Sequence, residues 1–338
     1  MKKILIFGAT GTVGAYSALY LKDKGYDIIA SGRRKSDNGF FHEHGIQYFS
    51  VNISNKNEFS TLDGMKPDVI LHCAGIMPAT MREYYPQQYI DSILTGTLNV
   101  LEYARIGGVK KMLFTQSHAD SKWLMETQKP IPADIEKKFP LTGDHAVYAI
   151  CKNAAVDLIE HYFYEYGIQR FVFRLPTIYA YHPNPFFYVN GKKKWIAYRL
   201  LIEQAIRGAT IEVWGNAERK KEITYIGDLC QIFERAIESE LNGGMYNVGR
   251  GIGVSLEEQI RGIVEVFCNP EKKSQIIYSP EKPDAPQFIH DISKTQQELG
   301  YQPEYDYQRL LLAFKNEMCM ERFAGLWGKK ADFPLEMD

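Results

Sequence analysis

The sequence predicts an α/β fold, a doubly wound parallel sheet with a smaller mixed α/β lobe. Short apolar segments alternate with longer helical patterns from residue 2 to about residue 175, which is the order of a parallel sheet with crossover helices. After residue 176 the alternation weakens, and the segments become short and mixed. We therefore expect a first domain over residues 1–175, to which residues 222–250 return, and a second lobe formed by residues 176–221 and 251–338.

Each element is predicted from a local pattern. Short runs of branched and aromatic residues indicate strands, and apolar residues spaced by three and four indicate helices. The expected strands are 2–7, 27–31, 46–49, 67–73, 111–115, 169–175, 210–214, 245–248 and 275–278. The expected helices are 15–24, 83–105, 144–166, 196–207, 226–238, 255–267, 291–299 and 307–321, and a long loop is expected over residues 122–143.

Composition and charge exclude several classes of protein. The net charge of the 338 residues is −1, so no overall field attracts nucleic acid or an anionic membrane. No apolar run is long enough to cross a bilayer, and the one near the start is too short for a signal peptide. The five cysteines are scattered without a CxxC pair, which indicates reduced thiols in a cytoplasmic protein. The His42-Glu43-His44 segment has no further ligand in view, so no metal site is predicted.

The first strand runs directly into a glycine-rich turn. Gly8-Ala9-Thr10-Gly11-Thr12-Val13-Gly14 stands between the strand and the first helix. Gly8 can adopt backbone angles closed to other residues, Gly11 leaves room for a pyrophosphate, and Gly14 lets the helix approach the strand. Phosphates then meet free N–H groups at the positive end of a helix. This pattern predicts a Rossmann-type NAD(P)-binding domain.

The second strand indicates which dinucleotide is bound. An acidic residue near its end holds the ribose hydroxyls of NAD in such folds, but this chain has Ser31-Gly32-Arg33-Arg34. Two guanidinium groups suit a 2′-phosphate, so we expect NADP(H) rather than NAD(H). The alternative is a solvated basic turn. The small residues Ala74 and Gly75, after the fourth strand, would let the cofactor lie against the strand end.

A tyrosine and a lysine on one helix are candidates for proton transfer. Tyr148 and Lys152 are four residues apart and therefore share a helix face. An ammonium group beside the phenol would lower its pKa from about 10, so that it could exchange a proton with a substrate hydroxyl or carbonyl. Ser117, at the end of the neighbouring strand, could hold the same oxygen, while a nicotinamide exchanges the hydride. The alternative is an incidental helix pair.

Taken together, these segments resemble an extended short-chain dehydrogenase/reductase of the NAD-dependent epimerase/dehydratase family. The matching stretches, in family order, are GATGTVG from Gly8, HCAG from His72, GTLNVLEYA from Gly96, YAICK from Tyr148, RLPTIY from Arg174, YIGDL from Tyr225 and YNVGRGIGVSLEE from Tyr246. The resemblance implies that Ser117, Tyr148 and Lys152 are catalytic. It also implies a homodimer formed through residues 83–105 and 144–166.

The resemblance and the glycine turn together define the expected cofactor site. The residues expected to bind the cofactor are Gly8, Thr10, Gly11, Thr12, Val13, Gly14, Arg33, Arg34, Asn52, Ile53, Cys73, Ala74, Gly75, Tyr148, Lys152, Pro176 and Thr177. On the substrate side the expected residues are His118, Thr177 and Lys221.

Departures from the family pattern reduce the number of reactions that this chain could catalyse. Sugar dehydratases of this family carry an Asp-Glu pair where this chain has His118 and Ala119, so elimination of water lacks its acid and base. Nucleotide-sugar enzymes usually have a diphosphate-binding arginine where this chain has Lys221. A lysine supplies the positive charge but not the two parallel hydrogen bonds of a guanidinium group. The sequence therefore favours a nucleotide-sugar epimerase or ketoreductase. The alternatives are a reductase of a non-sugar carbonyl and a non-catalytic NADP-binding sensor.

Overall fold

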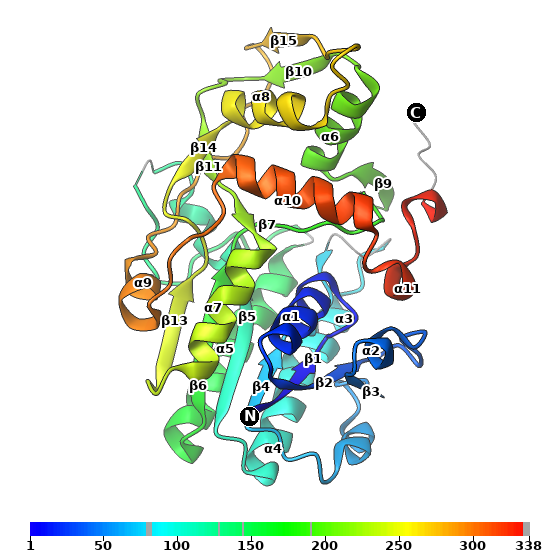
Figure 1. Ribbon diagram of the computed structural model, residues 1–338. Coiled ribbons are helices and arrows are strands. Elements are labelled where there is room, and N and C mark those ends of the chain that lie inside the picture. Colours follow the sequence, from blue (N-terminus) through cyan, green and yellow to red (C-terminus); the bar gives the residue numbers. More distant parts are fainter. Residues whose placement is uncertain (79–82, 128, 144, 190, 334–338) are drawn as a thin grey trace.

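The computed structural model describes residues 1–78, 83–127, 129–143, 145–189 and 191–333. Its larger part is a seven-stranded sheet in the order β13-β6-β5-β4-β1-β2-β3, in which every neighbouring pair is parallel (Figure 1). The strands are β1 (Lys3–Phe7), β2 (Asp27–Gly32), β3 (Gln47–Ser50), β4 (Val69–His72), β5 (Lys111–Ser117), β6 (Gln169–Leu175) and β13 (Gly243–Asn247). The strand order reverses between β1 and β4, which is where open α/β sheets bind ligands.

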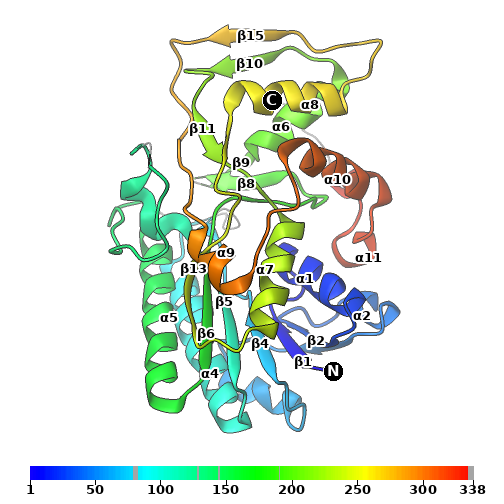
Figure 2. The same cartoon turned by 60° about the vertical axis from the view of Figure 1, so that its left-hand side comes forward.

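Helices cover both faces of this sheet, because alternate strand residues point to opposite sides. Ile4 and Ile6 of β1 pack in one core with α1 (Thr12–Asp23) and α7 (Ile226–Glu238). Leu5 and Phe7 pack in a second core with α4 (Gly96–Gly107) and α5 (His145–Tyr166). Figure 2 shows α4 and α5 on the side of the sheet opposite α1 and α7. The predicted doubly wound fold is confirmed.

Most of the elements after β6 form a smaller lobe above the carboxyl ends of the strands (Figures 1 and 2). Its paired strands are short: β7 (Ile178–Tyr179) with β12 (Thr224–Tyr225), β8 (Phe186–Val189) with β9 (Lys192–Trp195), β10 (Ile211–Trp214) with β15 (Ile276–Ser279), and β11 (Lys220–Glu222) with β14 (Gly253–Ser255). Its longer helices are α6 (Ala197–Arg207), α8 (Leu256–Phe267) and α10 (Tyr307–Met320), followed by the short α11 (Ala324–Trp327). The helix α9 (Ser293–Leu299) packs instead beside β13.

The observed bounds agree with the predicted ones to within a few residues. The helix expected over residues 83–105 is an unbroken helical run over residues 86–107, in which a π-helical segment, Ile90–Thr95, joins α3 (Pro86–Tyr89) to α4. Asp144, the expected first residue of the next long helix, lies outside the described residues. β13 pairs with β6, so the chain does return to the sheet after residue 222. The division into two lobes at the predicted boundaries stays our proposal.

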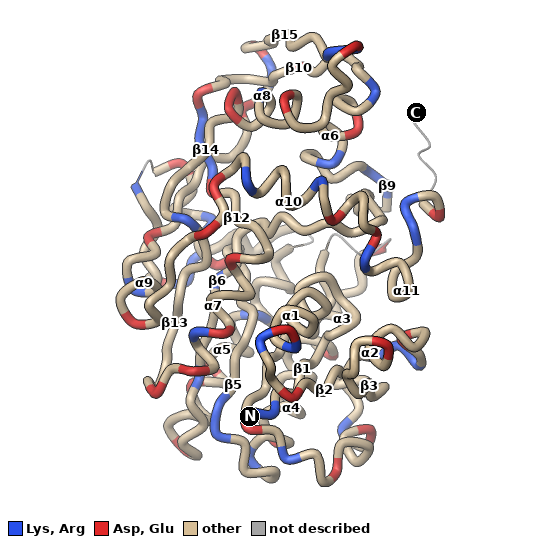
Figure 3. The backbone as a smooth tube through the Cα atoms, viewed as in Figure 1, with Lys and Arg blue, Asp and Glu red and all other residues tan. Residues whose placement is uncertain are grey.

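Charged residues of both signs are interspersed along the chain, as Figure 3 shows. Among the described residues, no helix has the length and apolar character that a membrane-spanning segment needs.

Candidate active site

The carboxyl ends of β1, β2 and β4 border a crevice at the point where the strand order reverses. Gly8 follows β1 with a φ of +84°, and a Cβ there would lie 2.7 Å from the backbone nitrogen of Ala74. A Cβ at Gly14 would lie 2.3 Å from the carbonyl oxygen of Gly8. Only glycine fits at these positions, and the turn stays narrow enough for a ligand to approach its backbone. Gly11 is the N-cap of α1 and offers no side chain to cap it, so the positive helix end can meet an anion.

A cavity of about 590 Å³ occupies this crevice. Its volume is typical of small-molecule and cofactor sites. The predicted cofactor residues that line it are Gly8, Thr10, Gly11, Thr12, Arg33, Arg34, Asn52, Ile53, Cys73, Ala74 and Gly75. The remaining predicted ones, Val13, Gly14, Tyr148, Lys152, Pro176 and Thr177, are not among its lining residues. The glycine cradle and the cavity together fit a dinucleotide.

The sequence prediction missed several residues of this cavity. Asp91 and Ser92 line it from the π-helical segment, and His182 reaches it from the smaller lobe. The Ser92 hydroxyl accepts a hydrogen bond from the backbone N–H of Ile76 (3.2 Å), which fixes the loop after β4. A π-helix has no strong sequence signature, and His182 is far along the chain, so neither was predictable from local patterns.

The two arginines after β2 differ in their surroundings. Arg33 is exposed at the cavity. Arg34 donates from Nη1 to the carbonyl oxygen of Leu326 (2.7 Å), near the C-terminus. The Tyr48 hydroxyl holds the backbone of the same turn by donating to the Arg34 carbonyl (2.6 Å). Arg34 is therefore partly engaged by the protein itself.

Lys152 is buried beneath the far end of the cavity. It is 6% exposed, and its Nζ donates to the carbonyl oxygen of Thr115 (2.6 Å) and lies 4.5 Å from the centre of the Phe114 ring. A Cβ at Gly75, which lines the cavity, would lie 4.0 Å from this nitrogen. Burial lowers the pKa of Lys152 to about 8. The structure thus places the amine next to the wall of the cofactor crevice.

Tyr148 is also buried, 8% exposed, with its ring edge-on to that of Tyr89 (centroids 5.9 Å apart). We expected Lys152 to lower the pKa of this phenol. Instead, burial raises the pKa of Tyr148, and the hydrogen bond from Ser117 opposes the rise only in part. Lys152 is not among the groups that shift it, so within the chain alone that part of our hypothesis is wrong.

The three predicted substrate residues lie in different environments. Thr177 is exposed between β6 and β7, and Lys221 is half-buried on β11 with a pKa lowered by burial. His118 follows Ser117, and its Nδ1 is buried with no hydrogen-bond partner among the described residues. Burial lowers the pKa of His118 to about 4, so the ring is neutral near pH 7. Its ring lies edge-on to Phe288, with centroids 5.1 Å apart.

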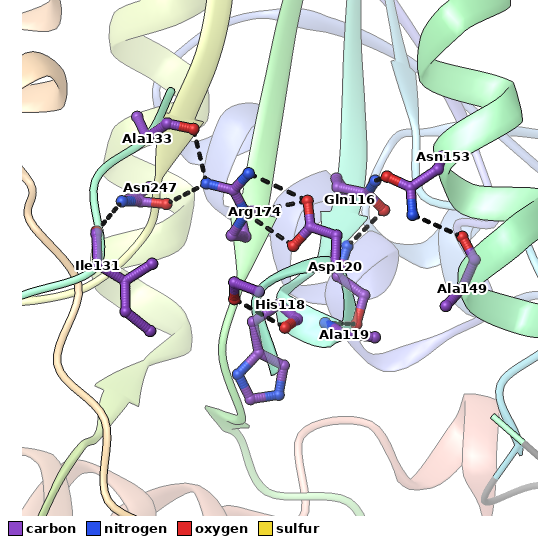
Figure 4. A network of polar contacts seen from close by, with 12 residues as sticks. Gln116, His118, Ala119, Asp120, Ile131, Ala133, Ala149, Asn153, Arg174 and Asn247 are labelled. Carbon is purple, nitrogen blue, oxygen red and sulfur yellow. Dashed lines mark hydrogen bonds and ion pairs between the residues drawn. The ribbon is translucent and has the colours of Figure 1, made fainter. Parts of the chain in front are cut away.

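A buried ion pair, missed in the sequence, supports the turn that carries Ser117 and His118. Arg174 of β6 donates from Nε to Asp120 (2.8 Å), from Nη1 to the Ala133 carbonyl oxygen (2.8 Å), and from the same nitrogen to Asn247 Oδ1 (2.9 Å). Figure 4 shows this network, with the His118 ring turned away from it. Arg174 and Asn247 lie in the RLPTIY and YNVG stretches, and this position in two family-like stretches was the only sequence feature that could have indicated the pair.

The fold and the crevice together define a dinucleotide-binding α/β enzyme. Among the described residues, no group of three or more His, Cys, Asp or Glu side chains could hold a metal ion. The model of the NAD dependent epimerase/dehydratase family matches residues 4–249, and the chain belongs to this family. It is therefore an enzyme of the NAD-dependent epimerase/dehydratase type.

Individual relatives are distant but match over most of their length. The chain is 25% identical over 260 residues to a UDP-glucuronate 4-epimerase of Thermodesulfobacterium geofontis, covering 77% of this chain and 75% of that one. A UDP-glucose 4-epimerase of Thermotoga maritima, solved with UDP-glucose, has a TM-score of 0.74 at 20% identity and covers 94% of this chain and 99% of its own. A Thermus thermophilus UDP-glucose 4-epimerase complex with NAD gives 0.71 at 19% identity, covering 93% and 99%.

Our expectation of NADP(H) over NAD(H) is wrong. The family is NAD-dependent, and the Thermus thermophilus protein was solved with NAD. The structure supplies a physical reason, because the guanidinium of Arg34 already binds the Leu326 carbonyl oxygen. The two guanidinium groups are therefore not both available to bind a phosphate, and the solvated basic turn was the better interpretation of Arg33.

Proposed function

We propose that this protein is an NAD-dependent epimerase of a nucleotide sugar, and that Ser117, Tyr148 and Lys152 are its catalytic residues. The observation that carries the proposal is the position of Lys152 beside Gly75, at the cavity wall, with Tyr148 on the same helix and hydrogen-bonded to Ser117. Its similarity to a UDP-glucuronate 4-epimerase and to a UDP-glucose 4-epimerase supports the substrate class. The NAD dependence of the family is consistent with an epimerase, which returns the hydride to its substrate within one turnover and needs no external reductant.

The chain's own groups suffice for the proton transfers of such a reaction. When bound, NAD would supply a hydride acceptor for a secondary alcohol and the hydride donor that restores it. Tyr148 takes the hydroxyl proton as the C–H bond breaks, and it gives the proton back when the carbonyl is reduced on its other face, so that no net oxidation occurs. Ser117 orients the phenol, and buried Lys152 holds the cofactor's ribose.

On the substrate side, we propose that Lys221 binds the diphosphate. Its ammonium lies on β11, at the base of the smaller lobe, and is half-buried. Charge-assisted contacts are strong where water is partly excluded. His118 and Thr177 would contact the sugar. A thermal-shift screen with UDP, GDP, dTDP and CDP tests this arrangement, since a protein stabilised by none of them would instead be a reductase of a non-sugar carbonyl.

Tyr148→Phe tests the catalytic assignment. The variant should lower kcat for the interconversion of UDP-sugar epimers by about 10²- to 10⁴-fold, because it removes the proton carrier and leaves the ring packing intact. Tyr164→Phe is the matched control, since Tyr164 is on the same helix and 79% exposed. Equal turnover by both variants, followed by NMR of the UDP-glucose and UDP-glucuronate products, would remove Tyr148 from the mechanism.

We further propose that the protein is a cytoplasmic homodimer. The exposed apolar side chains Leu98 and Ile106 on α4, and Ile150 on α5, lie on the two helices expected to meet the partner. The cysteines are all free thiols, as a reducing compartment would keep them. Light scattering during size-exclusion chromatography distinguishes a dimer from a 38.8 kDa monomer.

A further inference from the structure

The last α-helix of the described chain, α11, returns to the cofactor crevice. After α10, Glu321 takes a left-handed φ of +44°, and the chain turns back through residues 323–327, which comprise Phe323 and α11. Figures 1 and 2 both show α11 between the end of α10 and α2 (Phe40–Glu43), close to α1. The 323–327 segment lies outside residues 4–249, so the family match says nothing of it.

This segment binds two residues of the cavity wall through its polar groups. The indole Nε1 of Trp327 donates to the carbonyl oxygen of Thr10 (2.9 Å), within the glycine turn. Arg34 Nη1 donates to the carbonyl oxygen of Leu326 (2.7 Å), and Asn38 Nδ2 donates to that of Gly325 (3.2 Å). The glycine turn and the end of β2 are therefore held by residues 317 and 292 positions away in the chain.

The third wall residue is held by ring stacking. Trp327 lies against the His182 ring, with centroids 4.6 Å apart and an interplanar angle of 33°. His182 Nδ1 accepts a hydrogen bond from the backbone N–H of Asn184 (3.1 Å), and burial lowers the pKa of His182 to about 4. The neutral ring therefore carries its proton on Nε2, and His182 lines the cavity.

The 323–327 segment is itself firmly packed. Phe323, Leu326 and Trp327 are 3%, 1% and 7% exposed. Phe323 stacks on Trp327 (4.5 Å) and contacts the Tyr16 ring of α1 (4.4 Å). A segment buried to this degree has a defined position and can fix the position of the groups bound to it.

We propose that the 323–327 segment is part of the cofactor site, and that it sets how tightly the adenosine-diphosphate half of NAD is held by positioning Thr10, Arg34 and His182. The half is identified by position, because Thr10 is in the pyrophosphate-binding turn and Arg34 follows β2, where the adenosine ribose binds. Trp327 does not line the cavity, so it acts as a positioning residue. This inference rests on the proposed NAD binding but not on the sugar substrate.

Calorimetric titration of the full-length protein with NAD and with ADP tests the proposal. Trp327→Phe keeps the stacking and loses one hydrogen bond, so the Kd for both ligands should rise about fivefold. Trp327→Ala also loses the stacking on His182, and the Kd should rise by at least about tenfold. The Kd for UDP should be unchanged in both. Leu312→Ala is the control, because Leu312 is 53% exposed on α10.

The outcomes separate this inference from the proposed function. If wild-type protein binds no NAD, the proposed function fails. If wild type binds NAD and Trp327→Phe binds NAD and ADP within twofold of it, only this inference is overturned, even when the melting temperature falls. Where Trp327→Ala does not fold, Trp327→Phe decides. A loss of UDP affinity equal to the loss of ADP affinity would show a general structural effect and would also overturn it.

Discussion

Replacing Asp120 with asparagine should lower the melting temperature by several degrees, because it leaves the buried charge of Arg174 without its counter-ion. The two side chains are 1% and 2% exposed. Breaking such a pair costs about 3–5 kcal/mol, since the remaining charge stays in a low-dielectric site. The other acceptors around the guanidinium, including Asn247 Oδ1 and the Ala133 carbonyl oxygen, are neutral and cannot replace the carboxylate.

The expected shift follows from the size of the chain. At about 2.1 cal/mol/K per residue, unfolding the 338 residues carries an entropy of roughly 0.7 kcal/mol/K, so the loss corresponds to about 4–7 °C in Tm. Differential scanning calorimetry measures it. Asp157→Asn is the control, because Asp157 pairs with Lys137 at the surface and is 69% exposed. That variant should shift the Tm by less than about 1 °C.

A double variant isolates the charge from the packing. Asp120→Leu combined with Arg174→Met removes both charges and keeps apolar volume, and buried pairs replaced in this way often lose little stability. The double variant should therefore melt above Asp120→Asn. A Tm for Asp120→Asn within 1 °C of wild type would refute the view that this pair holds the turn after β5.

Three further predictions concern titration and substrate binding. Burial raises the pKa of Glu222 to about 7 from 4.5, so its stabilising contribution is present below pH 4.5 and is lost as pH rises through 7. Burial lowers the pKa of His118 to about 4 and that of His290 to about 3, so the stabilising contribution of these neutral rings is lost as pH falls below 6.5. In wild type, protonation of Glu222 offsets part of this loss. Between pH 6.5 and 5 the Tm of Glu222→Gln should therefore fall more than the Tm of wild type. Because the pKa of Lys152 is about 8, kcat/KM should fall above pH 8, and a profile flat to pH 10 would contradict a role for the charged amine. Lys221→Met should raise the Kd of UDP by roughly tenfold and leave that of uridine unchanged, and equal effects on both would contradict a diphosphate contact.

The parts of the fold and site that sequence could predict depend on short-range patterns. The glycines of residues 8–14 are required by close backbone contacts within one strand–turn–helix unit, and the alternation of Ile4 and Leu5 follows from strand geometry. Contacts between distant segments had no such signal. The Arg34 bond to Leu326 spans 292 residues. Because of this bond, the basic turn at Arg33 and Arg34 is not the 2′-phosphate site that its local sequence suggested.

In the candidate active site, too, residue spacing predicted which side chains share a helix, but it did not predict their surroundings. A separation of four residues correctly places Tyr148 and Lys152 on one helix, but spacing does not say where the amine points. Its hydrogen bond to Thr115 is made to the carbonyl of a different element, β5. Burial then dominates the pKa values of both side chains, which no sequence pattern reports.

This environment yields a final prediction about how the phenol becomes reactive. Within the chain, burial raises the pKa of Tyr148, and only the Ser117 hydroxyl opposes it, so a proton acceptor near neutral pH needs positive charge from another source. The oxidised nicotinamide is a cation, and an opposite charge nearby lowers such a pKa by about 1–3 units. Ultraviolet titration near 295 nm, taken as wild type minus Tyr148→Phe, should show the phenolate forming at lower pH when NAD⁺ is added. Reduced NADH, which lacks the charge, should leave the titration unshifted. An identical titration with NAD⁺, NADH and no addition would mean that the cofactor does not activate this tyrosine.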